Sequence, residues 1–176
     1  MTSDCADGAG SAGVPPAFPP TWLEALVFER MQPEHLAAVL AIERLSFPSA
    51  WSAESYLREM RNPSGHYCVA RLEDEVIGYA GMWVVGDEAH VSTIAVREDR
   101  RRCGLGERLM RYLMSLAIRY QADRMSLEVR QSNLPAQALY AKLGFQAAAI
   151  RPHYYGDTGE DGVVMQIALG NAAGTD

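Results

Sequence analysis

The segment between Ile94 and Gly106 combines residue types that bind phosphate groups. Four arginines and two acids lie at positions 97–102, a local charge of +2 in a chain of 176 residues whose net charge is −6. Gly104 and Gly106 follow, where an expected strand and loop give way to a helix. A helix start with bare backbone amides and nearby arginines is typical of a pyrophosphate site. The alternative is an ordinary glycine-containing helix start whose arginines are solvated.

A carboxylate stands out in a second segment, residues 127–145. Alternation along the expected strand 125–130 places Glu128 and Arg130 on the face opposite to their apolar neighbours. An interior strand of a covered sheet is apolar on both faces, so a carboxylate there needs a reason. From the residues alone, an edge position or a structural pair of Glu128 with Arg130 is favoured. Tyr140, on the next helix, would by itself be core packing with a bonded hydroxyl.

The elements that must position these residues follow from the hydrophobic pattern along the chain. The expected strands cover 26–31, 66–72, 76–85, 88–96, 125–130, 145–151 and 163–169. The expected helices cover 33–44, 52–61, 105–120 and 133–142, with Ser52 as an N-cap. The order β-α-α-β-β-β-α-β-α-β-β predicts an α/β fold (an α+β mixed sheet) that is mostly antiparallel and carries helices on both faces.

Composition predicts the limits of the domain and restricts its partners. Thirteen of the first twenty residues are Gly, Ala, Pro or Ser, so we expect a flexible tail at 1–20, one domain at 21–171 and a disordered end at 172–176. The acidic balance argues against nucleic acid as a partner, and no apolar run is long enough to span a membrane. No secretory or transit signal is visible, which predicts a cytoplasmic protein. The scattered histidines and cysteines predict no metal site.

The arginine-rich loop resembles a coenzyme-binding motif. R-R-C-G-L-G at 101–106 is similar to the Gln/Arg-x-x-Gly-x-Gly/Ala motif of the GNAT N-acetyltransferases, and the resemblance extends over residues 27–169. It implies acetyl-CoA as co-substrate, with the pyrophosphate on the backbone of 101–107 and the pantetheine arm along 94–96. The Val96 amide would polarise the thioester carbonyl. The implied coenzyme-binding residues are Ile94, Ala95, Val96, Arg101, Arg102, Cys103, Gly104, Leu105, Gly106, Glu107 and Asn133.

The segment around Glu128 resembles one branch of this family, the RimI-type ribosomal-protein alanine N-acetyltransferases. L-E-V-R-Q-S-N at 127–133 and A-L-Y-A-K-L-G-F at 138–145 both match its pattern. The resemblance implies that Glu128 is the general base and Tyr140 the general acid. These residue types suit the chemistry, because an α-amine with a pKa of about 7.7–8.0 must lose a proton before it attacks. A phenol can then protonate the expelled thiolate, and no covalent enzyme intermediate is needed.

Two further segments resemble those that flank the acceptor in N-terminal acetyltransferases. S-F-P-S-A-W-S at 46–52 and H-Y-Y-G-D-T-G-E-D-G-V-V-M at 153–165 match, with Ala50 in place of a proline and Gly162 in place of an alanine. The implied substrate-binding residues are Phe47, Trp51, Tyr154 and Tyr155. The alternative for the two tyrosines is an exposed hairpin pair.

We therefore expect an enzyme that transfers the acetyl group of acetyl-CoA to the N-terminal α-amine of a protein. The resemblance implies the N-terminal alanine of a small-subunit ribosomal protein as substrate, and a basic ribosomal protein would suit the acidic chain. One alternative is an acetyltransferase for lysine or a small amine. The other is a non-catalytic acyl-CoA-binding module, against which the intact Glu128 and Tyr140 count.

Overall fold

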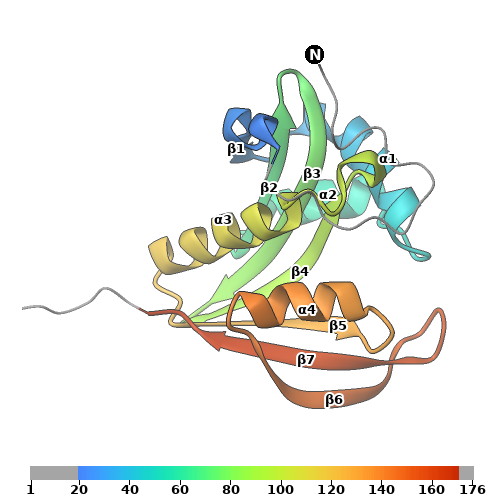
Figure 1. Cartoon of the computed structure of the whole chain (residues 1–176), viewed down its shortest axis with the longest axis vertical. Coiled ribbons are helices and arrows are strands. Elements are labelled where there is room, and N and C mark those ends of the chain that lie inside the picture. The colour runs from blue at the N-terminus through green and yellow to red at the C-terminus, as the bar shows by residue number, and fades with distance from the viewer. Residues whose placement is uncertain (1–19, 171–176) are drawn as a thin grey trace, which may run out of the picture.

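Seven strands form one mixed sheet in residues 20–170, the part of the chain that the computed structural model describes (Figure 1). The strands are β1 (Val27–Arg30), β2 (Gly65–Leu72), β3 (Glu75–Val85), β4 (Glu88–Val96), β5 (Arg124–Arg130), β6 (Gln146–Tyr155) and β7 (Glu160–Ala168). Their order is β1-β2-β3-β4-β5-β7-β6, and every neighbouring pair is antiparallel except β4 and β5. The expected mixed, mostly antiparallel sheet is confirmed. The expected tail at 1–20, apart from Pro20, and the expected disordered end at 172–176 lie outside the described residues.

Four helices pack on this sheet, and three of them begin within one residue of the predicted start. They are α1 (Leu36–Ser46), α2 (Ala53–Arg61), α3 (Leu105–Arg119) and α4 (Leu134–Lys142). Ser52 caps α2, since its hydroxyl accepts a hydrogen bond from the Ser55 N–H at 3.1 Å. The first helix begins later than predicted, because Pro33–His35 forms a 3-10 turn and α1 starts at Leu36.

α3 carries an apolar face that packs on the sheet. Four residues of this face are buried against the sheet: Leu105, Leu109, Leu113 and Ala117. The helix expected at 105–120 ends one residue earlier, at Arg119, and the Tyr120 side chain is exposed. Its ring stacks on His66 instead, with the two centroids 3.9 Å apart.

The helices lie on both faces of the sheet and bury two separate apolar clusters. α3 and α4 pack on the near face in Figure 1, against a cluster that includes Ile77 and Leu127. α1 and α2 pack on the opposite face, around Val39 and Tyr56. None of the helices within residues 20–170 is long and apolar enough to cross a membrane.

The sheet opens between β4 and β5. These parallel strands pair at only three positions, the last of which joins His90 to Ser126. Beyond His90, β4 has no neighbour on that side among the described residues, and a bulge leaves Ser92 outside its pairing with β3. Figure 1 shows β1–β4 and β5–β7 close together at one end and diverging toward the other. The opening therefore exposes the backbone of β4 and the side chains of β5 to a common space.

Candidate active site

A cavity of about 500 Å³ lies at the opening between β4 and β5. Its walls come from these two strands, from the segment that follows α1, from α4 and from the β6–β7 hairpin. Eight of the expected site residues line it: Glu128, Tyr140, Phe47, Trp51, Tyr154, Tyr155, Ile94 and Asn133. The fold thus brings together both expected catalytic residues and all four expected substrate-binding residues.

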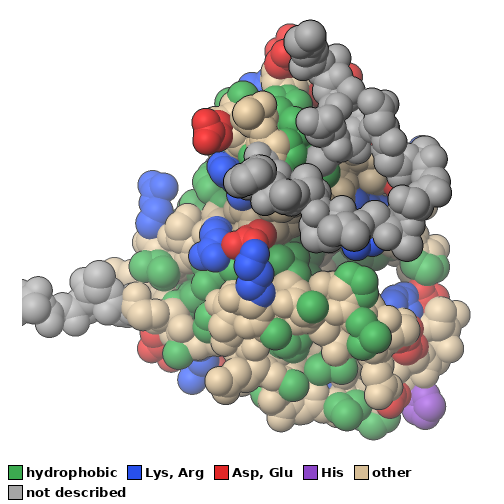
Figure 2. All heavy atoms as spheres, in the orientation of Figure 1, with side chains coloured by type: hydrophobic (Ala, Val, Ile, Leu, Met, Phe, Trp, Pro, Cys, Tyr) green, Lys and Arg blue, Asp and Glu red, His purple; other side chains and the backbone are tan. Residues whose placement is uncertain are grey.

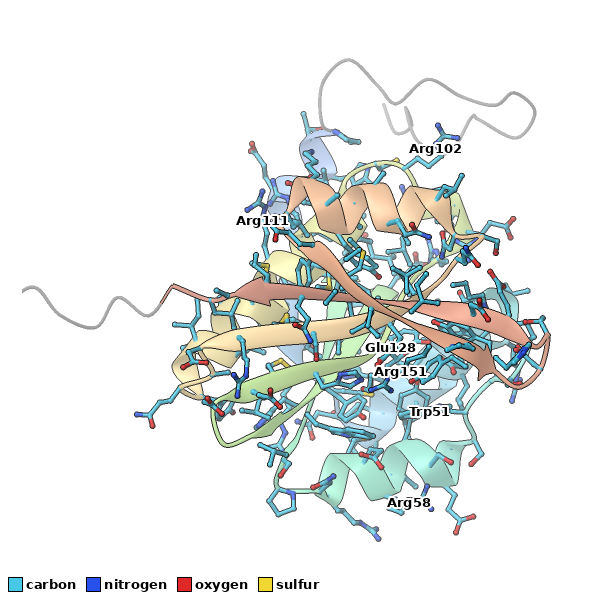
Figure 3. All side chains as sticks on the ribbon, turned by 90° about the horizontal axis from the view of Figure 1, so that it is seen from below. Trp51, Arg58, Arg102, Arg111, Glu128 and Arg151 are labelled. Atoms are coloured by element: carbon cyan, nitrogen blue, oxygen red, sulfur yellow. The ribbon has the colours of Figure 1, made fainter. Side chains whose placement is uncertain are left out.

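The Glu128 carboxylate lies in this cavity between two nitrogen donors. The Nε2 atom of His90 is 3.0 Å from one carboxylate oxygen, and the Nη1 atom of Arg151 is 3.0 Å from the other. Only 5% of the Glu128 side chain is exposed. The Ser126 hydroxyl lies 3.1 Å from the Nδ1 atom of His90 and orients its ring. Figure 3 shows Glu128, Arg151 and Trp51 close together on one side of the β5–β7 half of the sheet.

Of the two structural explanations for a carboxylate at position 128, the pair with Arg130 is wrong, whereas the edge position holds locally. β5 lies between β4 and β7, but its pairing with β4 ends at Ser126, so among the described residues Glu128 pairs only with Val164 of β7. Arg130 pairs with Asp157 at 2.6 Å and with Glu160 at 3.5 Å, rather than with Glu128. Its guanidinium also lies over the ring of Tyr155, 4.1 Å from the centroid. Glu128 is therefore a buried carboxylate that borders the cavity.

Tyr140 extends from α4 into the same cavity and is almost fully buried. Burial raises the pKa of its hydroxyl to about 12, and the nearby phenol of Tyr155 adds to the rise. Its ring also packs on Phe145, with the centroids 6.0 Å apart, so it contributes to the core as well. A phenol with this pKa keeps its proton at neutral pH and remains a proton donor.

A buried carboxylate fixes the loop that carries Phe47 and Trp51. Glu43, on α1, is 2% exposed and accepts hydrogen bonds from the Trp51 N–H at 2.9 Å and from the Tyr56 hydroxyl at 2.8 Å. The Tyr79 hydroxyl donates to the same carboxylate. Burial raises the pKa of Glu43, while the hydrogen bonds from Trp51 and Tyr56 partly oppose the rise. The loop beside the cavity is therefore tied to the core through Glu43.

The β6–β7 hairpin presents Tyr154 and Tyr155 to the cavity. Their rings are perpendicular, with the centroids 5.1 Å apart. Burial raises the pKa of both phenols, and at Tyr154 the charge of Glu128 adds to the rise. Tyr155 is half-buried beneath Arg130, whereas Tyr154 is 42% exposed. Both side chains therefore contact the cavity, and only Tyr154 keeps a large exposed surface.

The expected phosphate loop lies beside this cavity rather than in its wall. Gly104 caps α3 with a φ of +91°, a left-handed conformation that favours glycine. A Cβ at Gly106 would lie 3.4 Å from Leu139, an ordinary van der Waals contact, so α3 and α4 are close together at this point. Arg101 connects the loop to the cavity, since its guanidinium donates to the Val96 carbonyl and to the Ser46 hydroxyl, each at 3.1 Å.

Two of the four loop arginines are engaged by carboxylates. Arg97 pairs with Glu75 and Asp99, and Arg100 also lies near Asp99. Arg102 is exposed and makes no ion pair with another described residue; Figure 3 places it on the far side of the sheet from Glu128. The loop arginines without a carboxylate partner among the described residues are therefore Arg101 and Arg102, the two that the resemblance implied.

The Glu107 side chain, another expected coenzyme contact, is engaged in ion pairs within the protein. Glu107 pairs with Arg111 at 2.9 Å and with Lys142 at 2.7 Å. Figure 2 shows basic side chains on both sides of an acidic one over α3 and α4. Three further residues have buried side chains and can meet a ligand only through their backbone: Ala95, Cys103 and Leu105.

The backbone amide of Val96 faces the open side of β4. The Arg97 N–H donates to the Ile77 carbonyl of β3 at 2.9 Å. Successive amides of a strand point to opposite sides, so the Val96 N–H points away from β3. An N–H donor is therefore available where β5 has separated from β4.

Sequence reasoning missed three residues that hold this site: Glu43, His90 and Arg151. Only Glu43 had a usable signal, since it interrupts an otherwise apolar helix segment. His90 and Arg151 are ordinary strand residues until the sheet order brings β4 and β6 toward β5. Residues 20–170 contain no group of three or more His, Cys, Asp or Glu side chains that could hold a metal ion.

Comparison with known proteins gives the same result as the geometry. Residues 36–145 match the model of the acetyltransferase (GNAT) family. A candidate ribosomal protein bS18-alanine N-acetyltransferase of Bacillus subtilis is 41% identical over 79% of this chain and 93% of its own length. The ribosomal protein bS18-alanine N-acetyltransferase of Escherichia coli is 34% identical over 76% of this chain and 91% of its own length.

Solved structures show the same architecture. The crystal structure of the ribosomal-protein-S18-alanine N-acetyltransferase from Escherichia coli superposes with a TM-score of 0.77 and 30% identity, covering 86% of this chain and 97% of that one. Ard1 from Thermoplasma volcanium superposes with a TM-score of 0.76 and 27% identity, covering 82% and 98%. The family match and these similarities lead to one conclusion: the chain belongs to the GNAT family of acetyltransferases.

Proposed function

We propose that this enzyme transfers the acetyl group of acetyl-CoA to the N-terminal α-amine of a protein, with the N-terminal alanine of a small-subunit ribosomal protein as its cognate acceptor. The observation that carries the proposal is Glu128, a carboxylate that is 5% exposed and lies in the opening between β4 and β5. The names of the Bacillus subtilis and Escherichia coli relatives support an N-terminal alanine as the acceptor.

Glu128 is the general base of the proposed reaction. An α-amine is largely protonated at neutral pH and must lose a proton before its lone pair can attack the thioester carbonyl. A carboxylate in the cavity wall accepts that proton. His90 and Arg151 each take one carboxylate oxygen, which fixes the carboxylate while leaving further lone pairs for the amine or a bridging water.

Tyr140 is the general acid. Attack of the amine nitrogen forms a bond to the acetyl carbon and gives a tetrahedral intermediate. Its collapse breaks the bond between the acetyl carbon and the sulfur, and the thiolate leaves with the electron pair of that bond. The Tyr140 hydroxyl, whose pKa is raised to about 12, is protonated at neutral pH and can supply the proton that the thiolate takes. The Val96 N–H is suitably directed to stabilise the negative charge that develops on the acetyl oxygen.

The coenzyme would lie between the phosphate loop and the open side of β4. The start of α3, with glycines at 104 and 106, offers bare amides and a helix dipole to the pyrophosphate. Arg101 and Arg102 are the two loop arginines without a carboxylate partner among residues 20–170, so they are the ones we assign to phosphate charge. Asn133 caps α4, with its side chain accepting from the Ala136 N–H, and presents its remaining polar atoms to the cavity.

The acceptor would enter between the loop after α1 and the β6–β7 hairpin. Phe47 and Trp51 line one side of the cavity, and Tyr154 and Tyr155 line the other. An extended N-terminal segment between aromatic side chains can place its first residue over Glu128. The names of the relatives favour the end of a chain over an internal lysine as the acceptor.

A substrate panel tests the proposed function. The wild-type chain is incubated with acetyl-CoA and one of three acceptors: a peptide that begins with alanine, the same peptide with a blocked N-terminus and one internal lysine, and an aminoglycoside. Release of free thiol is followed with a chromogenic disulfide. We expect turnover with the first acceptor only. Turnover confined to the blocked peptide or the aminoglycoside would refute the proposal.

A further inference from the structure

A glycine on β7 lies directly beneath one of the acceptor-side tyrosines. Gly162 is buried, and a Cβ built on it would be 3.0 Å from Cδ1, 3.1 Å from Cβ and 3.1 Å from Cγ of Tyr154. Contacts below 3.4 Å are tighter than nine in ten real Cβ contacts. The atoms concerned belong to the root of the tyrosine side chain, which cannot rotate away as the far end of a flexible chain can. A side chain at 162 would therefore require Tyr154 to shift by a few tenths of an ångström.

The backbone of β6 forces this arrangement. Arg151 pairs with Gly162 and Tyr155 pairs with Glu160, so four steps along β6 face two steps along β7. The extra residues form a bulge in which His153 has a φ of +53°. Two hydrogen bonds hold the bulge: the His153 N–H donates to Asp161 at 2.9 Å, and the His153 Nδ1 atom lies 2.9 Å from the Gly159 carbonyl.

The bulge places the Tyr154 side chain on the face of the sheet that carries Glu128, the proposed base. Gly162 is the direct partner of both Arg130 on β5 and Arg151 on β6, and directly paired residues of an antiparallel sheet share a face. Glu128 belongs to the same face, two residues along β5. The charge of Glu128 contributes to the raised pKa of Tyr154, and the Arg151 guanidinium lies 5.5 Å from its ring centroid. The height of the Tyr154 ring therefore affects the free space beside Glu128.

We infer that Gly162 is a specificity-determining residue, which sets how much room Tyr154 leaves over Glu128 for the first residue of the acceptor. The inference rests on the proposed function and deepens it. A methyl group at 162 would lift the Tyr154 ring off the sheet by a few tenths of an ångström and into the acceptor space. Acceptors with a larger first side chain would lose more than acceptors with a smaller one.

The matched pair Gly162→Ala and Gly170→Ala tests this inference. Gly170 is the next glycine along the chain, and an added Cβ there meets nothing within 4 Å. We expect Gly162→Ala to lower kcat/KM for an alanine-starting peptide by about 3- to 10-fold. The loss in kcat/KM should be smaller for a glycine-starting peptide and larger for a serine-starting one. The KM for acetyl-CoA should not change. Gly170→Ala should behave as the wild type, and equal behaviour of the two variants would overturn the inference.

Two further measurements separate a specific effect from a loss of folding or of function. In a Tyr154→Ala background, Gly162→Ala should have almost no additional effect; a full effect there would overturn the inference, because Gly162 would then not act through Tyr154. Nitration of Tyr154 by tetranitromethane, located by peptide mapping, should be faster in Gly162→Ala than in Gly170→Ala, and equal rates would contradict the lifted ring. A wild-type chain inactive on every peptide would refute the proposed function and the acceptor role together, whereas an active wild type with an unchanged Gly162→Ala would refute only the inference.

Discussion

The Nε2 atom of His90 lies 3.0 Å from the Glu128 carboxylate at the point where β4 and β5 stop pairing. His90 and Ser126 form the last pair between β4 and β5. Glu128 lies two residues beyond Ser126 along β5. The separation of the strands therefore opens the sheet immediately beside the carboxylate. Both side chains of the pair line the cavity.

Replacing Glu128 with glutamine should abolish most of the activity without weakening coenzyme binding. The amide keeps the size of the side chain but accepts no proton at neutral pH, and a general base contributes at least about 100-fold to the rate. We expect kcat to fall by that factor while the calorimetric Kd for acetyl-CoA stays unchanged. A kcat within about twofold of the wild type would remove Glu128 as the base.

Replacing His90 with alanine should cost less than replacing Glu128. The change removes one hydrogen bond to a charged group, which is equivalent to about 10-fold in kcat, and leaves Arg151 on the other oxygen. Ser126→Ala is the matched control, because it removes only the contact that orients the His90 ring. We expect the order of losses to be Glu128→Gln, His90→Ala, Ser126→Ala in steady-state assays. A loss for Ser126→Ala that equals or exceeds the loss for His90→Ala would contradict this account.

Tyr140→Phe should lower kcat by about 10- to 100-fold and leave the KM values close to those of the wild type. The ring and its contact with Phe145 are retained, so the melting temperature should change little. Tyr112→Phe serves as a control, since this tyrosine lies on α3 outside the cavity. If the two variants had equal activity, Tyr140 would be a packing residue only.

Gly104→Ala should weaken coenzyme binding. A left-handed conformation costs a residue with a Cβ roughly 1–2 kcal/mol, and at Gly104 the strain falls on the start of α3. Gly86→Ala introduces a similar strain at a φ of +60° in the β3–β4 turn, where an added Cβ meets nothing within 4 Å. Both variants should lose a comparable amount in melting temperature. Calorimetry should show a higher Kd for acetyl-CoA in Gly104→Ala only. A higher Kd in both variants would mean that the phosphate loop has no special role in coenzyme binding.

The stability of the chain should depend on pH through Glu43. Burial raises its pKa in the folded state above the ordinary value of 4.5, so the folded chain holds this proton more tightly than the unfolded chain. The resulting stabilisation is complete below that ordinary value and is lost as the pH rises through the raised pKa. The free energy of unfolding of the wild type, minus that of Glu43→Gln, should therefore fall as the pH rises above the ordinary value of 4.5. A difference that rises over this range would contradict the assigned direction.

Much of the fold was predictable because its signals are local. The hydrophobic pattern identified α3, Ser52 marked the start of α2, and Gly104 marked the end of the phosphate loop. The end of α3 was missed because Tyr120 fits the helical pattern, whereas its ring finds a partner on β2 in His66. A pairing between distant segments of this kind leaves no trace in a local pattern.

The candidate site was predictable only in part, for the same reason. The resemblance to known motifs identified Glu128, Tyr140 and the paired tyrosines, and the fold places all of them in one cavity. The residues that hold Glu128 come from β4 and β6, and only the sheet order brings them together. In the phosphate loop, neighbouring carboxylates engage Arg97 and Arg100 and leave Arg101 and Arg102, the two arginines that the resemblance implied.

The central claim is that Glu128 drives acetylation of a protein N-terminus, and one mass-spectrometric measurement tests it most directly. A purified small-subunit ribosomal protein with a free N-terminal alanine is incubated with acetyl-CoA and either the wild-type chain or Glu128→Gln. The account predicts a single acetyl group on the α-amine of the alanine with the wild type and almost none with the variant in the same time. Acetyl groups confined to lysine side chains, or equal acetylation by both proteins, would contradict it.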